Sequence, residues 1–361
     1  MTIRVAQVGT GNAGSLTLRQ LIQDERFELV AVGVSTPGKV GTDAGELAGL
    51  DVVTGVTAVG DLDAVVAAEP DCVVYCAMGD TRPIEATNDV CRLLEAGVDV
   101  VGSAPGTLQY PWKSMPDKVL EKVEAAARAG DATVYITGVD PGFASDLIPL
   151  ALASTCQSVE QIRCYELADY ATYDGAEVMF DLMGFGQPLT ETPMLFLPGV
   201  LGFAWGTAIR MMAEGLGISV DEIIEHWEAE PAPESYDIAV GRIEKGTIAA
   251  LRFTISGMVA GHAAIVIEHV TRTRGDLRPD WARPAAGSGS YRIEITGEPS
   301  YVVDIVPSSE RGDHNHAAIV AACGRIVNAI PDVLAAAPGI RTTLDLPLPT
   351  GRGTFTAPVR A

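Results

Sequence analysis

The chain has 361 residues, 47% of them hydrophobic and 20% charged, a composition typical of globular rather than disordered proteins. Its formal net charge of −22 disfavours nucleic acid and anionic membranes as partners. No apolar run reaches the roughly 20 residues of a membrane span, and the N-terminus leaves no room for a signal peptide. The six cysteines form no CxxC pair, which is typical of reduced thiols. We therefore expect a cytoplasmic protein.

The first 140 residues alternate short Val/Ile-rich runs with helical patterns. The expected strands are Arg4–Val8, Glu28–Val34, Cys72–Cys76, Asp99–Val101 and Thr133–Thr137. The expected helices are Ser15–Gln23, Asp61–Ala68, Pro83–Ala96 and Pro116–Ala129. Strands that alternate with helices form βαβ units, so this pattern predicts an α/β domain with a doubly wound parallel sheet of the Rossmann type.

Beyond residue 140 the pattern changes to long β segments. After a helix at Ser145–Thr155, the expected strands are Gln161–Ala168, Thr247–Val259, His262–Thr273, Ser290–Thr296 and Tyr301–Val306. Consecutive strands without helices between them favour a mostly antiparallel sheet, with helices at Gly199–Glu214 and Val220–Ala229 covering it. Residues 141–310 are thus predicted to form a second, α+β domain for substrate binding and dimerisation. Residues 311–361, with a helix at His316–Ile330, are expected to return to the first domain.

A glycine-rich motif follows the first expected strand and opens the first expected helix. It is a GxGxxG that comprises Gly9, Thr10, Gly11, Asn12, Ala13 and Gly14. The first glycine permits the tight turn, the second lets the backbone approach a pyrophosphate, and the third lets the helix pack on the strand. The amides and dipole at the helix start bind the phosphates. This placement predicts a dinucleotide site.

The end of the second strand discriminates between NADP and NAD. An acidic residue there would accept hydrogen bonds from the adenosine ribose, but the chain has Ser35, Thr36 and Lys39. Two hydroxyls and a cation favour NADP, although Lys39 is equally explained as a solvated loop lysine and NAD is not excluded. Further cofactor contacts are expected after two later strands, at Ala77, Met78, Gly79, Ser103, Ala104 and Pro105.

Four segments, in order along nearly the whole chain, resemble one family. They are Gly9–Gly14, Lys39–Leu47, Thr137–Phe143, and Val327–Pro331 with its continuation to Pro347. The family is that of the native amine dehydrogenases and 2,4-diaminopentanoate dehydrogenases, relatives of dihydrodipicolinate reductase. The resemblance implies a Rossmann domain, a substrate domain, a homodimer, and NAD(P)H-dependent interconversion of a ketone or aldehyde plus ammonia with an amine.

The chain departs from this family at one turn. Family members carry a Cys-Glu-Glu-Leu-like turn after the strand equivalent to Asp99–Val101, and one of its glutamates is the catalytic carboxylate. Here residues 102–112 read GSAPGTLQYPW, without an acid. Reductive amination needs a group that accepts a proton from ammonium and handles protons as the carbinolamine dehydrates. The amination would therefore be weak, carried by another residue, or replaced by plain carbonyl reduction.

Three residues are candidates for proton chemistry. Asp140 lies in a Gly-Val-Asp-Pro-Gly-Phe turn where the resemblance places the nicotinamide, so it is also a candidate cofactor ligand. His262 lies between two β segments, and an imidazole there could exchange protons near neutral pH. Tyr173, with Tyr170 beside it, could hydrogen-bond a carbonyl oxygen. Each has a structural alternative: an Asx-turn acid for Asp140, a satisfied core histidine for His262, and packing for the tyrosines.

No metal is expected. Asp313 and His316 have a ligand-like spacing, but helix capping by Asp313 explains it without a second ligand cluster. An apolar stretch between Met179 and Trp205, interrupted by Gly and Pro, is a candidate wall for a hydrophobic substrate pocket. The leading hypothesis is an NAD(P)H-dependent, amine dehydrogenase-like oxidoreductase that acts on a small carbonyl or amine substrate. The alternatives are a carbonyl/imine or dihydrodipicolinate-type reductase, and a non-catalytic NADP-binding sensor.

Overall fold

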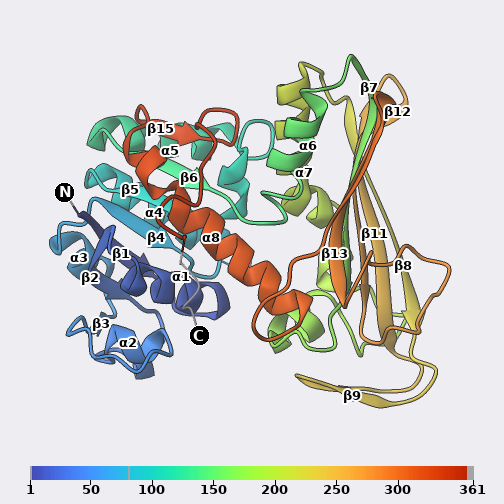
Figure 1. The fold of residues 1–361 in the computed structure, drawn as a ribbon, viewed down its shortest axis with the longest axis horizontal. Coiled ribbons are helices and arrows are strands. Elements are labelled where there is room, and N and C mark those ends of the chain that lie inside the picture. The colour runs from blue at the N-terminus through green and yellow to red at the C-terminus, as the bar shows by residue number, and fades with distance from the viewer. Residues whose placement is uncertain (1, 80–81, 356–361) are drawn as a thin grey trace. The chain divides into compact units, whose positions relative to one another are not determined.

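A computed structural model describes residues 2–79 and 82–355. The chain separates into two compact units. Unit 1 comprises residues 1–138 together with 320–361, and unit 2 comprises residues 139–319. Each unit is built around its own sheet (Figure 1).

Unit 1 contains a seven-stranded sheet of order β15-β6-β5-β4-β1-β2-β3 in which every neighbouring pair is parallel. Its strands are β1 (Ile3–Val8), β2 (Phe27–Gly33), β3 (Ala58–Val59), β4 (Cys72–Tyr75), β5 (Asp99–Gly102), β6 (Thr133–Ile136) and β15 (Gly339–Arg341). The five predicted strands are present, and the predicted doubly wound parallel sheet is confirmed. The short β3 and β15, which extend it at its two edges, were not predicted because two or three residues give no periodicity.

Helices pack on both faces of this sheet. They are α1 (Asn12–Gln23), α2 (Ala44–Leu47), α3 (Leu62–Ala67), α4 (Pro83–Glu95), α5 (Asp117–Gly130) and α8 (His314–Leu334). One face carries α4 and α5 through buried residues such as Val90, Leu94 and Val123. On the opposite face, Ile326, Val327, Ile330 and Val333 of α8 pack against β1, β4, β5 and β6. Strands buried on both sides read as continuous apolar runs, which is why the sequence located them.

Helix α8 has the length and hydropathy of a helix that could cross a membrane. About half of the most apolar stretch of this helix is buried inside the protein. Apolar side chains of its C-terminal half, such as Ile326 and Ile330, lie in the core of unit 1, and the helix also carries the buried Arg325. Its composition therefore agrees with that of a core helix.

Unit 2 contains a six-stranded sheet of order β14-β13-β7-β12-β11-β8. Its strands are β7 (Ser158–Asp169), β8 (Glu222–Pro231), β11 (Ile248–Val259), β12 (His262–Arg272), β13 (Gly289–Glu298) and β14 (Tyr301–Ile305). Only the β7–β12 pair is parallel, so the prediction of a mostly antiparallel sheet is confirmed. A separate hairpin joins β9 (Tyr236–Ile238) to β10 (Gly241–Ile243).

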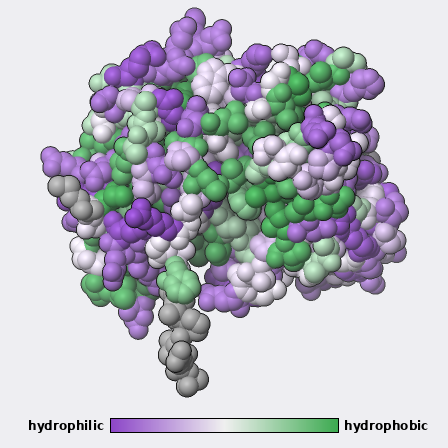
Figure 2. All heavy atoms as spheres, turned by 45° about the horizontal axis from the view of Figure 1, so that its top comes forward, coloured by the Kyte–Doolittle hydropathy of each residue, from purple (hydrophilic) through white to green (hydrophobic). Residues whose placement is uncertain are grey.

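Two helices, α6 (Leu147–Ala153) and α7 (Val200–Leu216), cover one face of this sheet (Figure 1). A Cβ on Gly257 of β11 would lie 2.5 Å from Ile209 of α7, so the missing side chain lets the helix approach closely. Short helical turns lie at Pro37–Lys39, Gly106–Gln109, Glu177–Leu182 and Met194–Phe196. Figure 2 shows hydrophobic areas among hydrophilic side chains on one face of the surface. Val53, Ile84 and Val302 are among the large hydrophobic residues with exposed side chains.

The predicted helix at Val220–Ala229 is wrong, because this segment forms strand β8. From Glu222 to Trp227, exposed side chains alternate with half-buried ones, which is the period of a strand. A short apolar run such as this one also fits a helical spacing. Pairing with β11 decides the conformation: β8 pairs with it from Glu222 to Pro231, with Trp227 opposite Phe253 and one register shift near Pro231. Ladder pairing along the one side of this edge strand that faces β11 outweighs the weak local preference.

Candidate active site

The glycine loop between β1 and α1 has the geometry of a phosphate cradle. Gly9 has a φ of +88°, and a Cβ on it would lie 2.6 Å from backbone atoms of Cys76 and Ala77. A Cβ on Gly14 would overlap the carbonyl oxygen of Gly9, whereas a Cβ on Gly11 would enter open space. Gly11 is also the N-cap of α1 and has no side chain to cap the helix. The loop thus presents a helix N-terminus beside free space, as an anionic ligand requires.

Side chains that the motif does not contain hold this loop in place. The buried Gln7 donates from Nε2 to the Gly9 carbonyl at 2.9 Å, and its Oε1 accepts from Thr17 Oγ1 at 2.9 Å. Lys39 donates from Nζ to the carbonyl oxygen of Thr10 at 2.8 Å and lies 3.1 Å from Thr10 Oγ1. Lys39 therefore braces the loop, a role that the sequence did not reveal.

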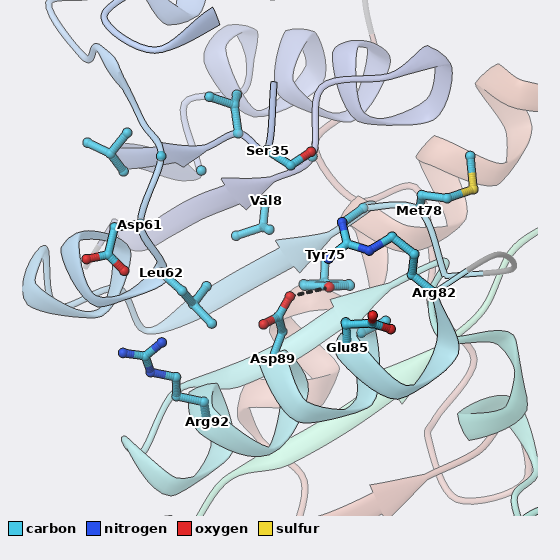
Figure 3. A pocket seen from close by; sticks show the side chains of 17 residues that line it. Val8, Ser35, Asp61, Leu62, Tyr75, Met78, Arg82, Glu85, Asp89 and Arg92 are labelled. Carbon is cyan, nitrogen blue, oxygen red and sulfur yellow. Dashed lines mark hydrogen bonds between the residues drawn. The ribbon is translucent and has the colours of Figure 1, made fainter. Parts of the chain in front are cut away.

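A cavity of about 290 Å³ opens beside the glycine loop, at the carboxyl ends of β1, β2 and β4 (Figure 3). Of the predicted cofactor residues, it brings together Gly9, Ser35, Ala77 and Met78. Its charged lining residues are Asp61, Arg82, Glu85, Asp89 and Arg92. The position next to a phosphate cradle, at the carboxyl edge of a parallel sheet, is where this fold binds the adenosine half of a dinucleotide.

The other predicted cofactor residues lie around this edge. Gly79 packs against the turn after β5, because a Cβ on it would lie 2.7 Å from that of Ala104 and 3.2 Å from Pro105. Ser103 donates its amide to the Tyr75 carbonyl at 3.1 Å, and Thr36 precedes the short turn that carries Lys39. Asn12 and Ala13 begin helix α1. The residues present therefore fit a nicotinamide dinucleotide, which supplies the hydride when bound.

Unit 2 holds a buried ionisable cluster of three residues from distant parts of the chain. His269 on β12 has Nδ1 3.0 Å from Glu166 Oε2 on β7, and Nε2 3.1 Å from Asp140 Oδ2 in the turn after β6. All three side chains are at least nine-tenths buried. The parallel register of β7 and β12 places Glu166 directly beside His269.

Hydroxyl groups from unit 2 support both carboxylates. Glu166 accepts from Tyr170 Oη at 3.0 Å and from Tyr291 Oη at 3.4 Å. Asp140 Oδ1 accepts from Ser145 Oγ at 2.8 Å, which in turn accepts from the Gly142 amide at 3.2 Å. These bonds compensate for removing the carboxylates from water.

The imidazole ring of His269 is enclosed by aromatic side chains. Phe253 of β11 stacks on it with ring centroids 4.6 Å apart and an interplanar angle of 14°. Trp205 of α7 meets it edge-on at 4.7 Å. A cation facing an aromatic ring is favoured, so this enclosure is compatible with a charged ring that cannot easily rotate.

The two carboxylates determine the protonation of this cluster. Burial alone lowers the pKa of His269, but Asp140 and Glu166 outweigh it and raise that pKa to about 10. Burial acts to raise the pKa of Glu166, but the hydrogen bond and charge of His269 hold it below its ordinary value. Near neutral pH the cluster therefore holds an imidazolium between two carboxylates.

The three residues also have the spacing of a metal site, with ligand atoms within 4.8 Å of one another. However, both ring nitrogens of His269 already lie at ion-pair distance from a carboxylate, and metal ligation would require the neutral imidazole. This chemistry favours a proton, not a metal ion, at the centre of the cluster.

The structure separates the three predicted catalytic residues. Asp140 belongs to the cluster. Tyr173 stacks on Tyr170, with ring centroids 5.1 Å apart, and Tyr170 in turn donates a hydrogen bond to Glu166. His262 is exposed at the start of β12, paired with Val259 in the β11–β12 turn, seven residues before His269. At about 3.3 Å per residue, the two histidines lie roughly 23 Å apart along the strand. The structure therefore does not bring His262 to Asp140.

Sequence reasoning missed His269, Glu166 and Tyr291. The available signal was a histidine inside a long apolar β run, where a polar side chain needs a buried partner. His314 is likewise buried, against Tyr291 at a centroid distance of 5.2 Å. Nearby, Asp313 Oδ1 accepts the His316 amide at 2.7 Å, the capping interaction predicted for it. Of the apolar stretch, Met179, Met183, Phe185 and Phe196 are buried in the core of unit 2.

A glycine cradle with a cavity beside it at the carboxyl edge of a parallel sheet, and a second unit that holds a buried acid–histidine cluster, are together typical of a nicotinamide-dependent oxidoreductase. Comparison with known proteins narrows the class. The model of the 2,4-diaminopentanoate dehydrogenase C-terminal domain matches residues 143–356. An amine dehydrogenase of Streptomyces virginiae is 40% identical over 342 residues, which cover 94% of this chain and 95% of that protein.

Relatives of lower sequence identity have the same two activities in their names. The 2,4-diaminopentanoate dehydrogenase of Acetoanaerobium sticklandii is 25% identical, over 96% of this chain and 94% of its own. The structure of an amine dehydrogenase from Mycobacterium smegmatis has the same fold, with a TM-score of 0.80, 21% identity, and coverage of 98% and 99% of the two chains. This chain belongs to the amine dehydrogenase and 2,4-diaminopentanoate dehydrogenase family of NAD(P)-dependent oxidoreductases.

Proposed function

We propose that the protein interconverts a small ketone or aldehyde plus ammonium with a primary amine, using NAD(P)H. The reaction consumes one carbonyl compound, one ammonium ion, one hydride and one proton, and yields an alkylammonium ion and water. Unit 1 holds the dinucleotide through its glycine loop and cavity, and unit 2 holds the substrate. The observation that carries this proposal is the buried Asp140–His269–Glu166 cluster: a site for a cationic amine needs negative charge, and two carboxylates against one imidazolium supply it.

The test is oxidation of NADPH and of NADH with a panel of small ketones, with and without ammonium chloride. We expect turnover that depends on ammonium, and formation of NAD(P)H when the corresponding amine and the oxidised cofactor are supplied. Equal turnover without ammonium would instead identify a carbonyl reductase, the candidate that the missing turn carboxylate favours. Binding of NADPH without any turnover would identify a sensor.

We also propose that NADPH binds more tightly than NADH. The support is the absence of an acid at the end of β2, where Ser35 lines the cavity, together with Arg82 in the cavity wall. Ser35→Asp should weaken NADPH selectively, because a carboxylate repels the 2′-phosphate but accepts hydrogen bonds from a ribose. Fluorescence titration of both cofactors tests this, with Ser35→Asn as the uncharged control. Wild type that prefers NADH would contradict the proposal.

Two further properties remain predictions. All six cysteines are free, which supports a reducing, cytoplasmic environment. The family resemblance predicts a homodimer, which sedimentation of the full chain would test.

A further inference from the structure

One buried nitrogen of the cluster, Nε2 of His269, has no well-aligned hydrogen-bond partner in the part of the chain that the structure describes. His269 Nε2 lies 3.1 Å from Asp140 Oδ2, an ion-pair distance, but it makes no well-aligned hydrogen bond within the described residues. A buried donor without an aligned acceptor costs free energy unless a ligand or water completes it. Nε2 is therefore the ring nitrogen of His269 whose hydrogen bonding a ligand atom would complete.

The surroundings of His269 leave this nitrogen as the one that can react. Nδ1 is taken by Glu166, and stacking by Phe253 with the edge of Trp205 fixes the ring plane. Glu166 is itself held by Tyr170 and Tyr291. A rigid ring whose far nitrogen is anchored on a carboxylate is the arrangement of a general acid–base histidine.

We propose that His269 carries the proton during amination through Nε2, in place of the carboxylate that other family members have in the turn after β5. This inference rests on the proposed function. Asp140 would hold the ammonium ion beside Nε2, and Glu166 would act as a positioning residue that keeps the imidazole oriented and basic.

The proton transfers balance. The neutral form of His269, which is the minor form below its pKa of about 10, takes one proton from ammonium, which becomes ammonia and forms the C–N bond to the carbonyl carbon. A proton shift from nitrogen to oxygen within this adduct gives the carbinolamine. The imidazolium then returns its proton to the carbinolamine hydroxyl, the C–O bond breaks, water leaves, and an iminium ion remains to accept the hydride. Ammonium and ketone are converted to iminium and water, and the imidazole is neutral again.

The charges that face His269 suit this exchange. They are Asp140 and Glu166 directly, with Tyr170, Tyr291 and His314 around Glu166, and the uncharged Phe253 and Trp205 over the ring. The resulting pKa of about 10 makes neutral His269 a stronger base toward ammonium than a histidine at its ordinary pKa of roughly 6.5. Proton exchange between groups of matched pKa is efficient, whereas an ordinary histidine would be a weak base toward ammonium.

The decisive experiment compares two reactions of the full-length protein. Pentan-2-one with ammonium chloride requires the proton steps of ammonia addition and dehydration. Reduction of the preformed cyclic imine 2-methyl-1-pyrroline, also a five-carbon substrate, requires only one proton on nitrogen, which the solvent supplies, and the hydride. We expect His269→Gln to lose amination by roughly 10²–10⁴-fold while imine reduction falls by no more than about tenfold. The matched control is His226→Gln, an exposed histidine on β8 of the same sheet, for which both rates should remain those of wild type.

A second variant keeps the imidazole and changes only its pKa. Glu166→Gln removes one of the two charges that raise it. Because His269 must be neutral to accept the proton, its pKa sets the acid limb of the amination pH profile, and this limb should move to lower pH. A merely structural role would lower the rate at all pH values without moving the limb. NADPH titration and thermal melting would show whether His269→Gln folds. If it does not, the pH profile of Glu166→Gln still tests whether His269 carries the proton.

The outcomes separate the two proposals. Equal loss of both reactions in His269→Gln, or selective loss of amination in His262→Ala instead, would overturn the role of His269 while leaving amination established. Wild type that reduces 2-methyl-1-pyrroline but never aminates pentan-2-one would overturn the proposed function itself, and the role of His269 with it.

Discussion

The two candidate sites of this protein are built in opposite ways. The dinucleotide loop of unit 1 consists of six consecutive residues, and its backbone conformation creates the site. The proton-exchanging cluster of unit 2 consists of three side chains separated by up to 129 positions, and their charges create the site. The first should therefore be sensitive to added side-chain atoms and the second to charge and pH. The following predictions test this contrast.

The largest effect is expected in the loop. Gly14→Ala should weaken NADPH binding by about tenfold to a hundredfold and lower the melting temperature, because its Cβ would overlap the Gly9 carbonyl and overpacking costs roughly 1–3 kcal/mol. Gly11→Ala, whose Cβ meets no protein atom, should weaken binding with an unchanged melting temperature. Titration and melting of both variants check this. If Gly11→Ala binds NADPH like wild type, the pyrophosphate does not lie on this loop.

A smaller gain is expected from restoring the missing carboxylate. Gly106 follows the turn after β5, and a Cβ there would have nothing within 4 Å, so a side chain can start at this position without a clash. Gly106→Glu should raise the amination rate by about tenfold, below the full general-base contribution because the turn was not shaped for it. Gly106→Gln is the uncharged control. A comparable gain in Gly106→Gln would show that charge is not the cause.

Lys39→Ala should weaken both cofactors by about tenfold, the equivalent of one partly exposed charge-assisted hydrogen bond. The reason is that Lys39 braces the Thr10 carbonyl, so its loss affects the loop that both cofactors share. Titration with NADH and NADPH measures the effect. A loss confined to NADPH would mean that Lys39 contacts the 2′-phosphate instead of bracing the loop.

The smallest effect concerns stability. The folded pKa of His269 is about 10, above its unfolded value of roughly 6.5, so the folded state binds the proton more tightly. The stability that this provides is complete below about pH 6.5 and is lost as the pH rises toward 10. Denaturant unfolding between pH 6 and 10 should show this fall, and the fall should be smaller in His269→Gln. Parallel curves for the two proteins would contradict the raised pKa.

Much of the architecture was predictable because it rests on local patterns. Buried parallel strands such as Cys72–Tyr75 are continuous apolar runs, and the glycine motif needs only its own residues and the strand before it. The segment Glu222–Pro231 was not predictable, because its apolar residues fit a helix and a strand equally well and pairing with β11 decides between them. The bracing of the loop by Gln7 and Lys39 likewise depends on contacts across the fold.

The amino-acid sequence by itself determined the glycine loop, most strands of the two sheets and the family, because each is encoded in local patterns along the chain. It also identified Asp140 as a candidate for proton chemistry. Only the tertiary structure decided which histidine joins it. His262 and His269 lie on the same strand, and the choice depends on the register of β12 with β7, which places Glu166 beside His269, and on the cover of α7, which buries that ring and leaves His262 in solvent. Charges from three distant segments then raise the pKa of that histidine, which no pattern within one segment can encode.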